Sequence, residues 1–268
     1  MAATPAARAV AAVGVDIGAT STRVAAFDRS DRVLSRLAVA TPRGPAAMVD
    51  VVAGLVGQVS DGDAATVAVG LPGHVDVADG SVRNALNLGI DVPTPFGADL
   101  AARIGRAVHV ENDVNAGALG AAEVLGVRPP SSLAYLSIGT GLAAGLVLDG
   151  RIHRGSIGMA GEIGHVPVRA DGPLCSCGQL GCAETLGSGG AIAERWGPDG
   201  AAALWSAADA GDRVALGVRD DFVGAVCATI RLVVLTLDVD VVALGGGVSQ
   251  LGEPLVRELR RALAVDAE

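Results

Sequence analysis

The chain of 268 residues is 50% hydrophobic and 18% charged, which is ordinary for a globular protein, and its length allows one large hydrophobic core or two smaller ones. We expect two lobes. Its 20 basic and 29 acidic side chains give a formal charge of −9, which disfavours nucleic-acid binding. With two Trp, one Tyr and three Phe, the chain has few aromatic side chains on which a ligand could stack, so hydrogen bonds must hold any polar ligand.

Neither a leader nor a membrane span is indicated by the pattern of apolar residues. The stretch from Met1 to Ala12 is alanine-rich and lacks the long apolar core of a signal peptide. The longest apolar run, Phe222 to Leu237, is interrupted by Arg231 and lies between Asp221 and Asp238. We therefore expect a cytoplasmic protein without membrane partners, in which cysteine thiols stay reduced.

Three strands are predicted at the start of the chain, over 13–17, 22–28 and 33–40. The turn after the first strand contains Asp16, Gly18 and Thr20. Its backbone N–H groups and hydroxyls are of the kind that hold a phosphate. The signal is weak by itself, because most glycine turns between strands bind nothing.

A helix is predicted next over 45–59, followed by a turn at 61–63 and a strand at 66–69. The strand leads into a segment rich in turn residues, where we interpret His74 as a surface residue.

Asp113 lies at a predicted junction between a strand and a helix. The strand covers 108–113 and ends in polar residues, and helical periodicity follows over 114–125. A carboxylate at such a junction is usually an N-cap, so these residues alone leave capping and chemistry open for Asp113.

Residues 133–148 repeat the strand, glycine turn and strand of residues 13–28, with Gly139, Thr140 and Gly141 in the turn. Two such hairpins indicate two lobes of related build, which we assign to residues 1–112 and 113–268. They also indicate a nucleotide site to which each hairpin contributes a phosphate loop.

Three of the four cysteines, Cys175, Cys177 and Cys182, follow His165 within a short glycine-rich stretch. Thiolate and imidazole donors suit zinc, and four protein ligands leave no open position, so we predict a structural zinc site in the loop 165–182. A disulfide, or thiols that are merely buried, are the alternatives.

After this loop, helices are predicted over 183–196, 201–210 and 219–237, and a strand over 239–244. Gly245 and Gly246 then open a last helix. Cys227 lies on the longest of these helices, away from the other cysteines, and we interpret it as a small core residue.

Several segments in order resemble the ROK family, which groups sugar kinases with sugar-responsive repressors. They are Asp16-Ile-Gly-Ala-Thr, Gly70-Leu-Pro-Gly-His-Val-Asp, Asn84-Ala-Leu-Asn-Leu, Glu111-Asn-Asp-Val-Asn-Ala, and Gly161-Glu-Ile-Gly-His with the following Cys-x-Cys-Gly-x-x-Gly-Cys and Glu184. The resemblance implies an α/β fold of two lobes, the actin-like ATPase or ribonuclease H-like fold, with a zinc knuckle in the second lobe.

The same resemblance implies an ATP-dependent kinase that phosphorylates a hexose hydroxyl, foremost the 6-OH of glucose or a related hexose or amino hexose, with Asp113 as general base. The implied sugar ligands are Asn87, Asn112, Glu162, His165 and Glu184. The implied nucleotide-binding residues are Asp16, Gly18, Thr20, Gly139, Thr140, Gly141, Gly245 and Gly246. ATP, Mg²⁺ and structural Zn²⁺ are the implied cofactors. For Asn87, capping of its own loop is an equal alternative.

Two residues depart from the family pattern: Ala19 and Ser21 stand where the phosphate loop of ROK kinases has Gly and Lys. The alternative is therefore a non-catalytic sugar-binding or sugar-sensing protein. Repressors of the family carry a helix-turn-helix before the first phosphate motif, and only 15 residues precede Asp16 here, which favours the kinase. We expect a small-molecule sugar and ATP as partners, and a homodimer or homotetramer.

Overall fold

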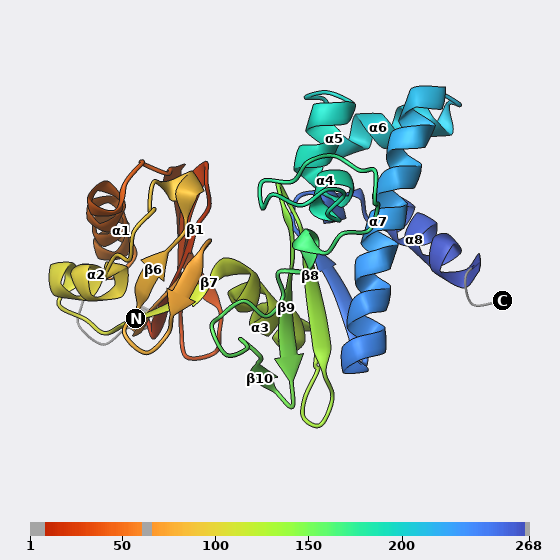
Figure 1. Cartoon of the computed structure of the whole chain (residues 1–268). Coiled ribbons are helices and arrows are strands. Elements are labelled where there is room, and N and C mark those ends of the chain that lie inside the picture. The colour runs from red at the N-terminus through yellow and green to blue at the C-terminus, as the bar shows by residue number, and fades with distance from the viewer. Residues whose placement is uncertain (1–8, 61–65, 266–268) are drawn as a thin grey trace, which may run out of the picture. The chain divides into compact units, whose positions relative to one another are not determined.

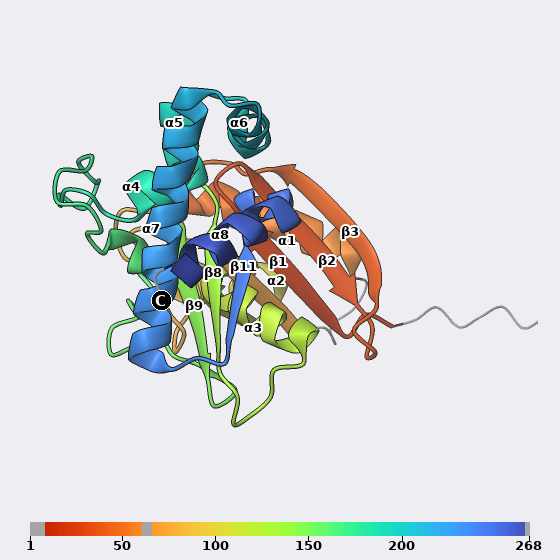
Figure 2. The same ribbon diagram turned by 90° about the vertical axis from the view of Figure 1, so that its right-hand side faces the viewer.

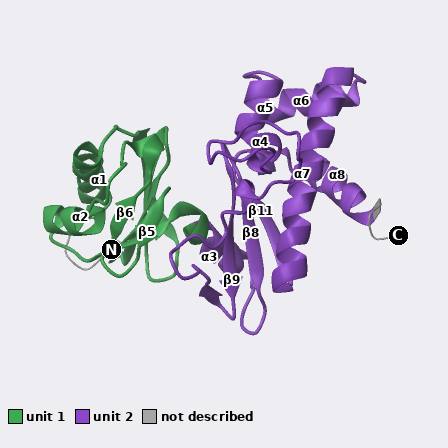
Figure 3. Ribbon diagram, viewed as in Figure 1, with its two compact units in different colours: residues 1–116 green, residues 117–268 purple. Residues whose placement is uncertain are grey.

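The computed structural model describes residues 9–60 and 66–265. The predicted turn at 61–63 lies outside this part of the chain, as does most of the stretch from Met1 to Ala12. The chain divides into two compact units, residues 1–116 and 117–268 (Figure 3). The boundary lies inside helix α3 (Asp113–Leu125), and the predicted lobes divide the chain at the start of that helix.

A five-stranded mixed sheet forms the centre of unit 1 (Figure 1). Its strands, in sheet order, are β3 (Val33–Ala40), β2 (Ser21–Phe27), β1 (Ala12–Ile17), β4 (Thr66–Leu71) and β7 (Val108–Asn112). Strand β2 is antiparallel to β1 and β3, whereas β1, β4 and β7 are parallel. Leu71 and Asn112 are partners in the register, so the carboxyl ends of β4 and β7 lie side by side.

Alternating apolar residues form the hydrophobic core of unit 1. Along β1 the side chains of Val13, Val15 and Ile17 are buried, as expected for one face of a pleated strand. Helices α1 (Pro45–Val59) and α2 (Phe96–Ile104) pack against each other and contribute to the same core. The helix predicted over 45–59 is therefore confirmed, whereas α2 was not predicted.

A small hairpin follows β4 in unit 1. It consists of β5 (His74–Asp76) and β6 (Ser81–Arg83), and the 3-10 turn η1 (Leu86–Leu88) comes after it. The interpretation of His74 as a surface turn residue is wrong: it lies on a strand, is half-buried, and its Nδ1 atom is buried.

A four-stranded sheet forms the centre of unit 2. Its strands, in sheet order, are β10 (Arg151–Ile152), β9 (Leu142–Leu148), β8 (Leu133–Ile138) and β11 (Val241–Gly245). Strand β8 is antiparallel to β9 and parallel to β11. In unit 1, β1 is likewise antiparallel to β2 and parallel to β4, so the hairpin repeat predicted from the sequence is present in both sheets.

Helices supply most of the remaining core of unit 2. They are α4 (Glu184–Gly187), α5 (Gly189–Arg195), α6 (Gly200–Asp209), α7 (Arg213–Leu237) and α8 (Glu253–Val265), with the 3-10 turns η2 (Ile163–His165) and η3 (Val248–Leu251). The long helix α7 lies along the sheet, and α8 packs against α7 (Figure 2). No helix in the described part of the chain is long and apolar enough to cross a membrane.

The single helix predicted over 183–196 is wrong, because the chain breaks at Ser188 into α4 and α5. The Ser188 side chain caps α5 by accepting a hydrogen bond from the Ala191 N–H at 3.0 Å. The break lets Gly189 and Gly190 approach the loop that follows β8, where a Cβ atom on either residue would lie 2.7 or 2.6 Å from a backbone oxygen. A continuous helix could not make this approach.

Helix α7 also begins earlier than the predicted residue 219. Its N-cap is Asp212, whose carboxylate accepts hydrogen bonds from the N–H groups of Val214 and Ala215, both at 2.9 Å. This signal is present in the sequence, because an Asp directly before an apolar periodic run is typical of a helix start.

One carboxylate joins three segments of unit 2. Asp221 on α7 forms ion pairs with Arg169, in the loop before the first cysteine, and with Arg195 at the end of α5. The hydrogen bonds from Arg169, and next those from Arg195, hold the pKa of Asp221 below its ordinary value. The side chain of Asp221 is only 24% exposed, so removing it would leave two arginines without their partner in a partly dehydrated place.

We therefore expect Asp221→Asn to lower the free energy of unfolding at pH 7 by about 1 to 2 kcal/mol, because Arg169 remains partly solvated. A depressed carboxyl pKa stabilises the fold above the unfolded value of about 3.9 and ceases to do so as the pH falls through the folded value. The difference between variant and wild type should thus shrink below pH ~4 in urea denaturation.

Glu123→Gln is the matched control, because the Glu123–Arg128 pair in the same unit is exposed at 75% and 56% and such pairs contribute little. Equal losses in both variants, or a difference for Asp221→Asn that persists unchanged at pH 3, would contradict this account of the Asp221 ion pairs.

Candidate functional site

The junction between β7 and α3 places Asp113 at the first position of a helix whose N-cap is Asn112. The Asn112 Oδ1 atom accepts hydrogen bonds from the N–H groups of Val114 at 2.9 Å and Asn115 at 3.2 Å. The Val114 N–H also lies 3.0 Å from the Asp113 carboxylate. Since Asn112 already caps the helix, the N-cap interpretation of Asp113 is not needed.

The Asn112 side chain also fixes the segment after β4. Its Nδ2 atom donates a hydrogen bond to the Gly73 carbonyl at 3.1 Å. Gly73 has φ 103°, and a Cβ atom there would lie 2.8 Å from the Arg83 carbonyl oxygen, so only glycine fits. Of the four hydrogen-bonding positions of the Asn112 amide, one N–H remains for a ligand.

Two residues that the sequence analysis did not single out stabilise this junction. The Glu111 Oε1 atom accepts hydrogen bonds from the Asn112 N–H at 3.0 Å and from the Asn115 Nδ2 at 3.1 Å. Asn115 is only 7% exposed. The signal was available in principle, because Glu111 and Asn115 lie symmetrically on either side of Asp113.

Hydrogen bonds from Thr41, the residue that follows β3, hold the turn between β1 and β2. Thr41, directly after β3, donates from its hydroxyl to the Gly18 carbonyl at 2.7 Å and from its N–H to the Thr20 carbonyl at 3.1 Å. The Asp16 carboxylate forms an ion pair with Arg23 at 3.2 Å, and both side chains are more than half exposed. In the described part of the chain, the N–H groups of Ala19 and Thr20 have no acceptor.

In unit 2 the turn between β8 and β9 has a related arrangement. The Gly139 and Thr140 carbonyls accept hydrogen bonds from the N–H groups of Gly189 at 2.7 Å and Gly190 at 3.1 Å. The N–H groups of Thr140 and Gly141 have no acceptor among the described residues. The turn is therefore rigidly held and leaves two donors for an anion.

The structure brings two further predicted residues to this turn. Gly246, at φ 82°, lies so close to Ile138 that a Cβ atom would be 2.5 Å from its carbonyl carbon. The Glu184 Oε2 atom accepts a hydrogen bond from the Leu142 N–H at 2.9 Å. Glu184 also blocks any side chain at Gly141, where a Cβ atom would lie 2.5 Å from Oε2.

Asn87 lies in η1 of unit 1, and its side chain is exposed. No hydrogen bond in the described chain involves this side chain, so the structure gives no support to the idea that it caps its own loop.

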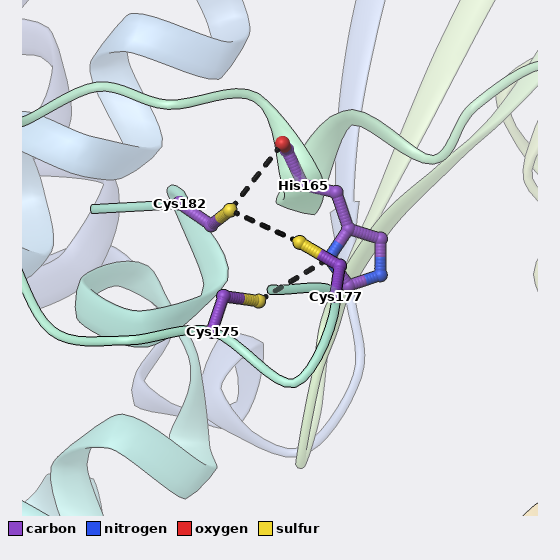
Figure 4. A group of neighbouring side chains, drawn as sticks. All are labelled: His165, Cys175, Cys177 and Cys182. Atoms are coloured by element: carbon purple, nitrogen blue, oxygen red, sulfur yellow. Dashed lines mark hydrogen bonds between the residues drawn. The ribbon is translucent and has the colours of Figure 1, made fainter. Parts of the chain in front are cut away.

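The predicted metal ligands His165, Cys175, Cys177 and Cys182 form one cluster, here the Cys/His cluster, with ligand atoms all within 4.8 Å of one another (Figure 4). The Cys177 and Cys182 sulfurs are 3.6 Å apart, and the Cys175 sulfur is 3.5 Å from His165 Nδ1. Ligands about 2.3 Å (S) and 2.0 Å (N) from a tetrahedral zinc ion would be separated by about 3.8 Å and 3.5 Å respectively. The donor set therefore fits zinc.

Gln179 contacts the same cluster from within the loop. Its Nε2 atom donates to the His165 carbonyl at 3.0 Å and to the Cys177 sulfur at 3.5 Å. Hydrogen bonds from Gln179 lower the pKa of the exposed Cys177 thiol to about 6, whereas burial raises that of Cys182 to about 12. A bound cation would bring both to the thiolate form.

His165 also connects the Cys/His cluster to a predicted sugar ligand. Its Nδ1 atom faces Cys175, and its Nε2 atom lies 3.9 Å from the Glu162 carboxylate. Both side chains are partly exposed, at 34% and 40%. Metal coordination through Nδ1 would fix the direction of Nε2.

Comparison with known proteins gives matches over nearly the whole chain. The model of the ROK family matches residues 12–267. A glucokinase from Thermotoga maritima is 33% identical over 270 residues, covering 92% of this chain and 85% of that protein. The crystal structure of a ROK family glucokinase from Streptomyces griseus in complex with glucose and AMPPNP has 29% identity and a TM-score of 0.78, and covers 94% of this chain and 88% of that one.

A regulator shares the same fold. The structure of a ROK family transcriptional regulator, a homologue of the E. coli MLC protein, has 22% identity and a TM-score of 0.80, and covers 95% of this chain and 69% of the regulator. The predicted mixed α/β fold of the actin-like ATPase class is therefore confirmed. The fold alone does not separate a kinase from a regulator.

The Cys/His cluster predicts about one zinc ion per chain in protein purified without chelator. Cys175→Ser should lose most of the metal and lower the melting temperature, because three ligands hold zinc far more weakly than four. Cys227→Ser is the control for metal content, since Cys227 is buried on α7 and belongs to no metal-ligating cluster in the described part of the chain. Elemental analysis that finds far less than one zinc per wild-type chain, with a melting temperature insensitive to chelator, would show that these cysteines are ordinary thiols.

Proposed function

The chain belongs to the ROK family, and on that premise we propose that it is an ATP-dependent sugar kinase, which transfers the γ-phosphate to a hydroxyl of a hexose. The glucokinase of Thermotoga maritima supports this over 92% of the chain. The Streptomyces griseus glucokinase supports the pair of substrates, because its structure contains glucose together with AMPPNP, an analogue of ATP. The proposed acceptor is the 6-OH of glucose or of a related hexose or amino hexose.

The observation that carries the proposal is the junction between β7 and α3. Asn112 caps α3 with two hydrogen bonds, and Asp113 follows it at the first position of the helix, where its carboxylate accepts a hydrogen bond from the Val114 N–H at 3.0 Å. We assign Asp113 as the general base that accepts the proton of the sugar hydroxyl while its oxygen attacks the γ-phosphorus in line. Catalysis of phosphoryl transfer depends almost entirely on positioning and electrostatic stabilisation, so the place of Asp113 relative to the sugar hydroxyl matters.

The proposed sugar ligands are Asn87, Asn112, Glu162, His165 and Glu184. Asn112 keeps one N–H, and Asn87 presents an exposed amide. Glu162 and His165 offer a carboxylate and a ring nitrogen within 3.9 Å of each other, a combination suited to neighbouring hydroxyls. Coordination of zinc by the Cys/His cluster would hold this His165 ring in one orientation.

The proposed nucleotide-binding residues are Asp16, Gly18, Thr20, Gly139, Thr140, Gly141, Gly245 and Gly246. Each hairpin turn leaves two backbone N–H groups without an acceptor in the described chain, and such groups bind phosphate oxygens. Mg²⁺ bound with ATP would neutralise part of the charge on the triphosphate.

A coupled assay with ATP and a panel of hexoses and amino hexoses tests the activity, and Asp113→Asn tests its base. We expect this variant to lower kcat by about 10² to 10⁴ while the KM for sugar changes less than about tenfold. Asp91→Asn, an exposed position in the same unit, should keep wild-type rates. Full activity of Asp113→Asn would exclude the proposed mechanism.

A non-catalytic sugar-binding or sugar-sensing protein is the second candidate, and the turn after β1 favours it. Ala19 and Ser21 replace Gly and Lys, and the Asp16 carboxylate is paired with Arg23 at 3.2 Å. Because exposed ion pairs are weak, ATP with Mg²⁺ can displace Arg23 from Asp16, and the kinase remains the first candidate.

For the kinase, we expect Ala19→Gly combined with Ser21→Lys to lower the KM for ATP severalfold, because a flexible loop and a cation improve contact with the phosphates. Steady-state kinetics at saturating sugar measure this change. If neither wild type nor this variant phosphorylates any sugar, while calorimetry shows sugar binding, the non-catalytic candidate is correct.

A further inference from the structure

We propose that Glu111 and Asn115 are positioning residues that set the direction of the Asp113 carboxylate. The inference rests on the proposed function, because it assigns a task to residues around the proposed base. Neither residue was assigned a role from the sequence. Their contribution follows from the hydrogen bonds at the end of β7 and the first turn of α3.

The Glu111 carboxylate spans the residue that carries the base. Its Oε1 atom accepts one hydrogen bond from the Asn112 N–H, before Asp113, and a second from the Asn115 Nδ2, after it. Hydrogen bonds to a carboxylate are shorter and stronger than those between neutral groups. The end of β7 and the start of α3 therefore both donate a hydrogen bond to the Glu111 Oε1 atom.

The backbone is thus fixed on both sides of Asp113. Glu111 holds the Asn112 N–H, and Asn112 in turn holds the Val114 N–H at 2.9 Å. These hydrogen bonds restrict the rotation of the neighbouring peptide groups and thereby limit the directions that the Cα–Cβ bond of Asp113 can take. A base must lie within hydrogen-bond reach of its proton, so a loss of this direction is expected to reduce kcat.

Helix capping does not explain the Glu111–Asn115 hydrogen bond. Asn112 already accepts from the N–H groups of Val114 and Asn115, which are the ones that an N-cap serves. Asn115 is 7% exposed, and an amide so placed requires hydrogen-bond partners. An apolar residue at position 115 could be buried without a carboxylate opposite it. The hydrogen-bonded pair of Glu111 and Asn115 therefore contributes the orientation of the segment around Asp113, which burial alone would not provide.

The test compares Glu111→Ala, Glu111→Gln, Asn115→Ala and the double alanine variant in the coupled kinase assay. Glu111→Ala and Asn115→Ala should each lower kcat about 10- to 100-fold, with the KM values for sugar and ATP within about threefold. Glu111→Gln keeps an acceptor oxygen and should recover kcat to within about fivefold of wild type. The double variant should lose no more than the worse single variant, because both remove the same hydrogen bond.

Glu123→Ala, an exposed position on the same helix, is the control and should keep kcat within about twofold. Melting temperatures show which variants are folded, and Glu111→Gln keeps the test decisive if an alanine variant does not fold. Wild-type kcat in folded Glu111→Ala, a loss that appears only in KM, additive losses in the double variant, or a folded Glu111→Gln as impaired as Glu111→Ala would each overturn the positioning role.

The two proposals fail in different ways. If the wild-type protein phosphorylates no sugar, the proposed function fails. If Asp113→Asn is fully active, the assignment of Asp113 as general base fails. The positioning role fails in either case. If the wild type is active and Asp113→Asn is not, while Glu111→Ala and Asn115→Ala behave as wild type, only the positioning role fails.

Discussion

The side chain of Asn112 is the interaction on which the proposed catalytic part of unit 1 depends. One amide caps α3 through Oδ1 and holds the Gly73 carbonyl through Nδ2, so it joins the segment after β4 to the start of the helix after β7. These segments are adjacent only because β4 and β7 are parallel and in register at Leu71 and Asn112. The place of Asp113 therefore follows from the order of the strands in the sheet and from the capping of α3 by Asn112.

Much of this architecture could be predicted from the sequence. Apolar periodicity predicted the residues of β3, α1, β8 and β9 correctly, and glycine turns after two strands predicted the repeated hairpin. The break at Ser188 could not be predicted, because it depends on the approach of Gly189 and Gly190 to a loop about fifty residues away in the chain. His74 was misjudged for a similar reason, since its burial arises from tertiary packing.

In the candidate site, too, some features could be predicted from the sequence and others depend on tertiary contacts. Spacing and residue type predicted the four members of the Cys/His cluster, and the structure brings their ligand atoms within 4.8 Å. Gln179 was missed because a side chain that supports its neighbours through hydrogen bonds has no characteristic residue type. Glu111 and Asn115 were missed although they lie symmetrically about Asp113, because their hydrogen bond is visible only in the structure. The role of Asp113 stays a prediction, and only the hydrogen bonds in the structure show that Asn112 is the N-cap of α3.

The hydrogen bonds of unit 2 connect the Cys/His cluster to the proposed phosphate loop. Cys182 lies two residues before Glu184, whose carboxylate accepts from the Leu142 N–H directly after the loop. Glu184 begins α4. After the break that follows α4, Gly189 and Gly190 donate hydrogen bonds to the carbonyls of the loop at residues 139 and 140. A metal that fixes Cys182 would therefore fix Glu184 and, through it, the loop. Loss of the metal is then expected to disturb nucleotide binding as well as sugar binding, although no proposed nucleotide-binding residue is a metal ligand.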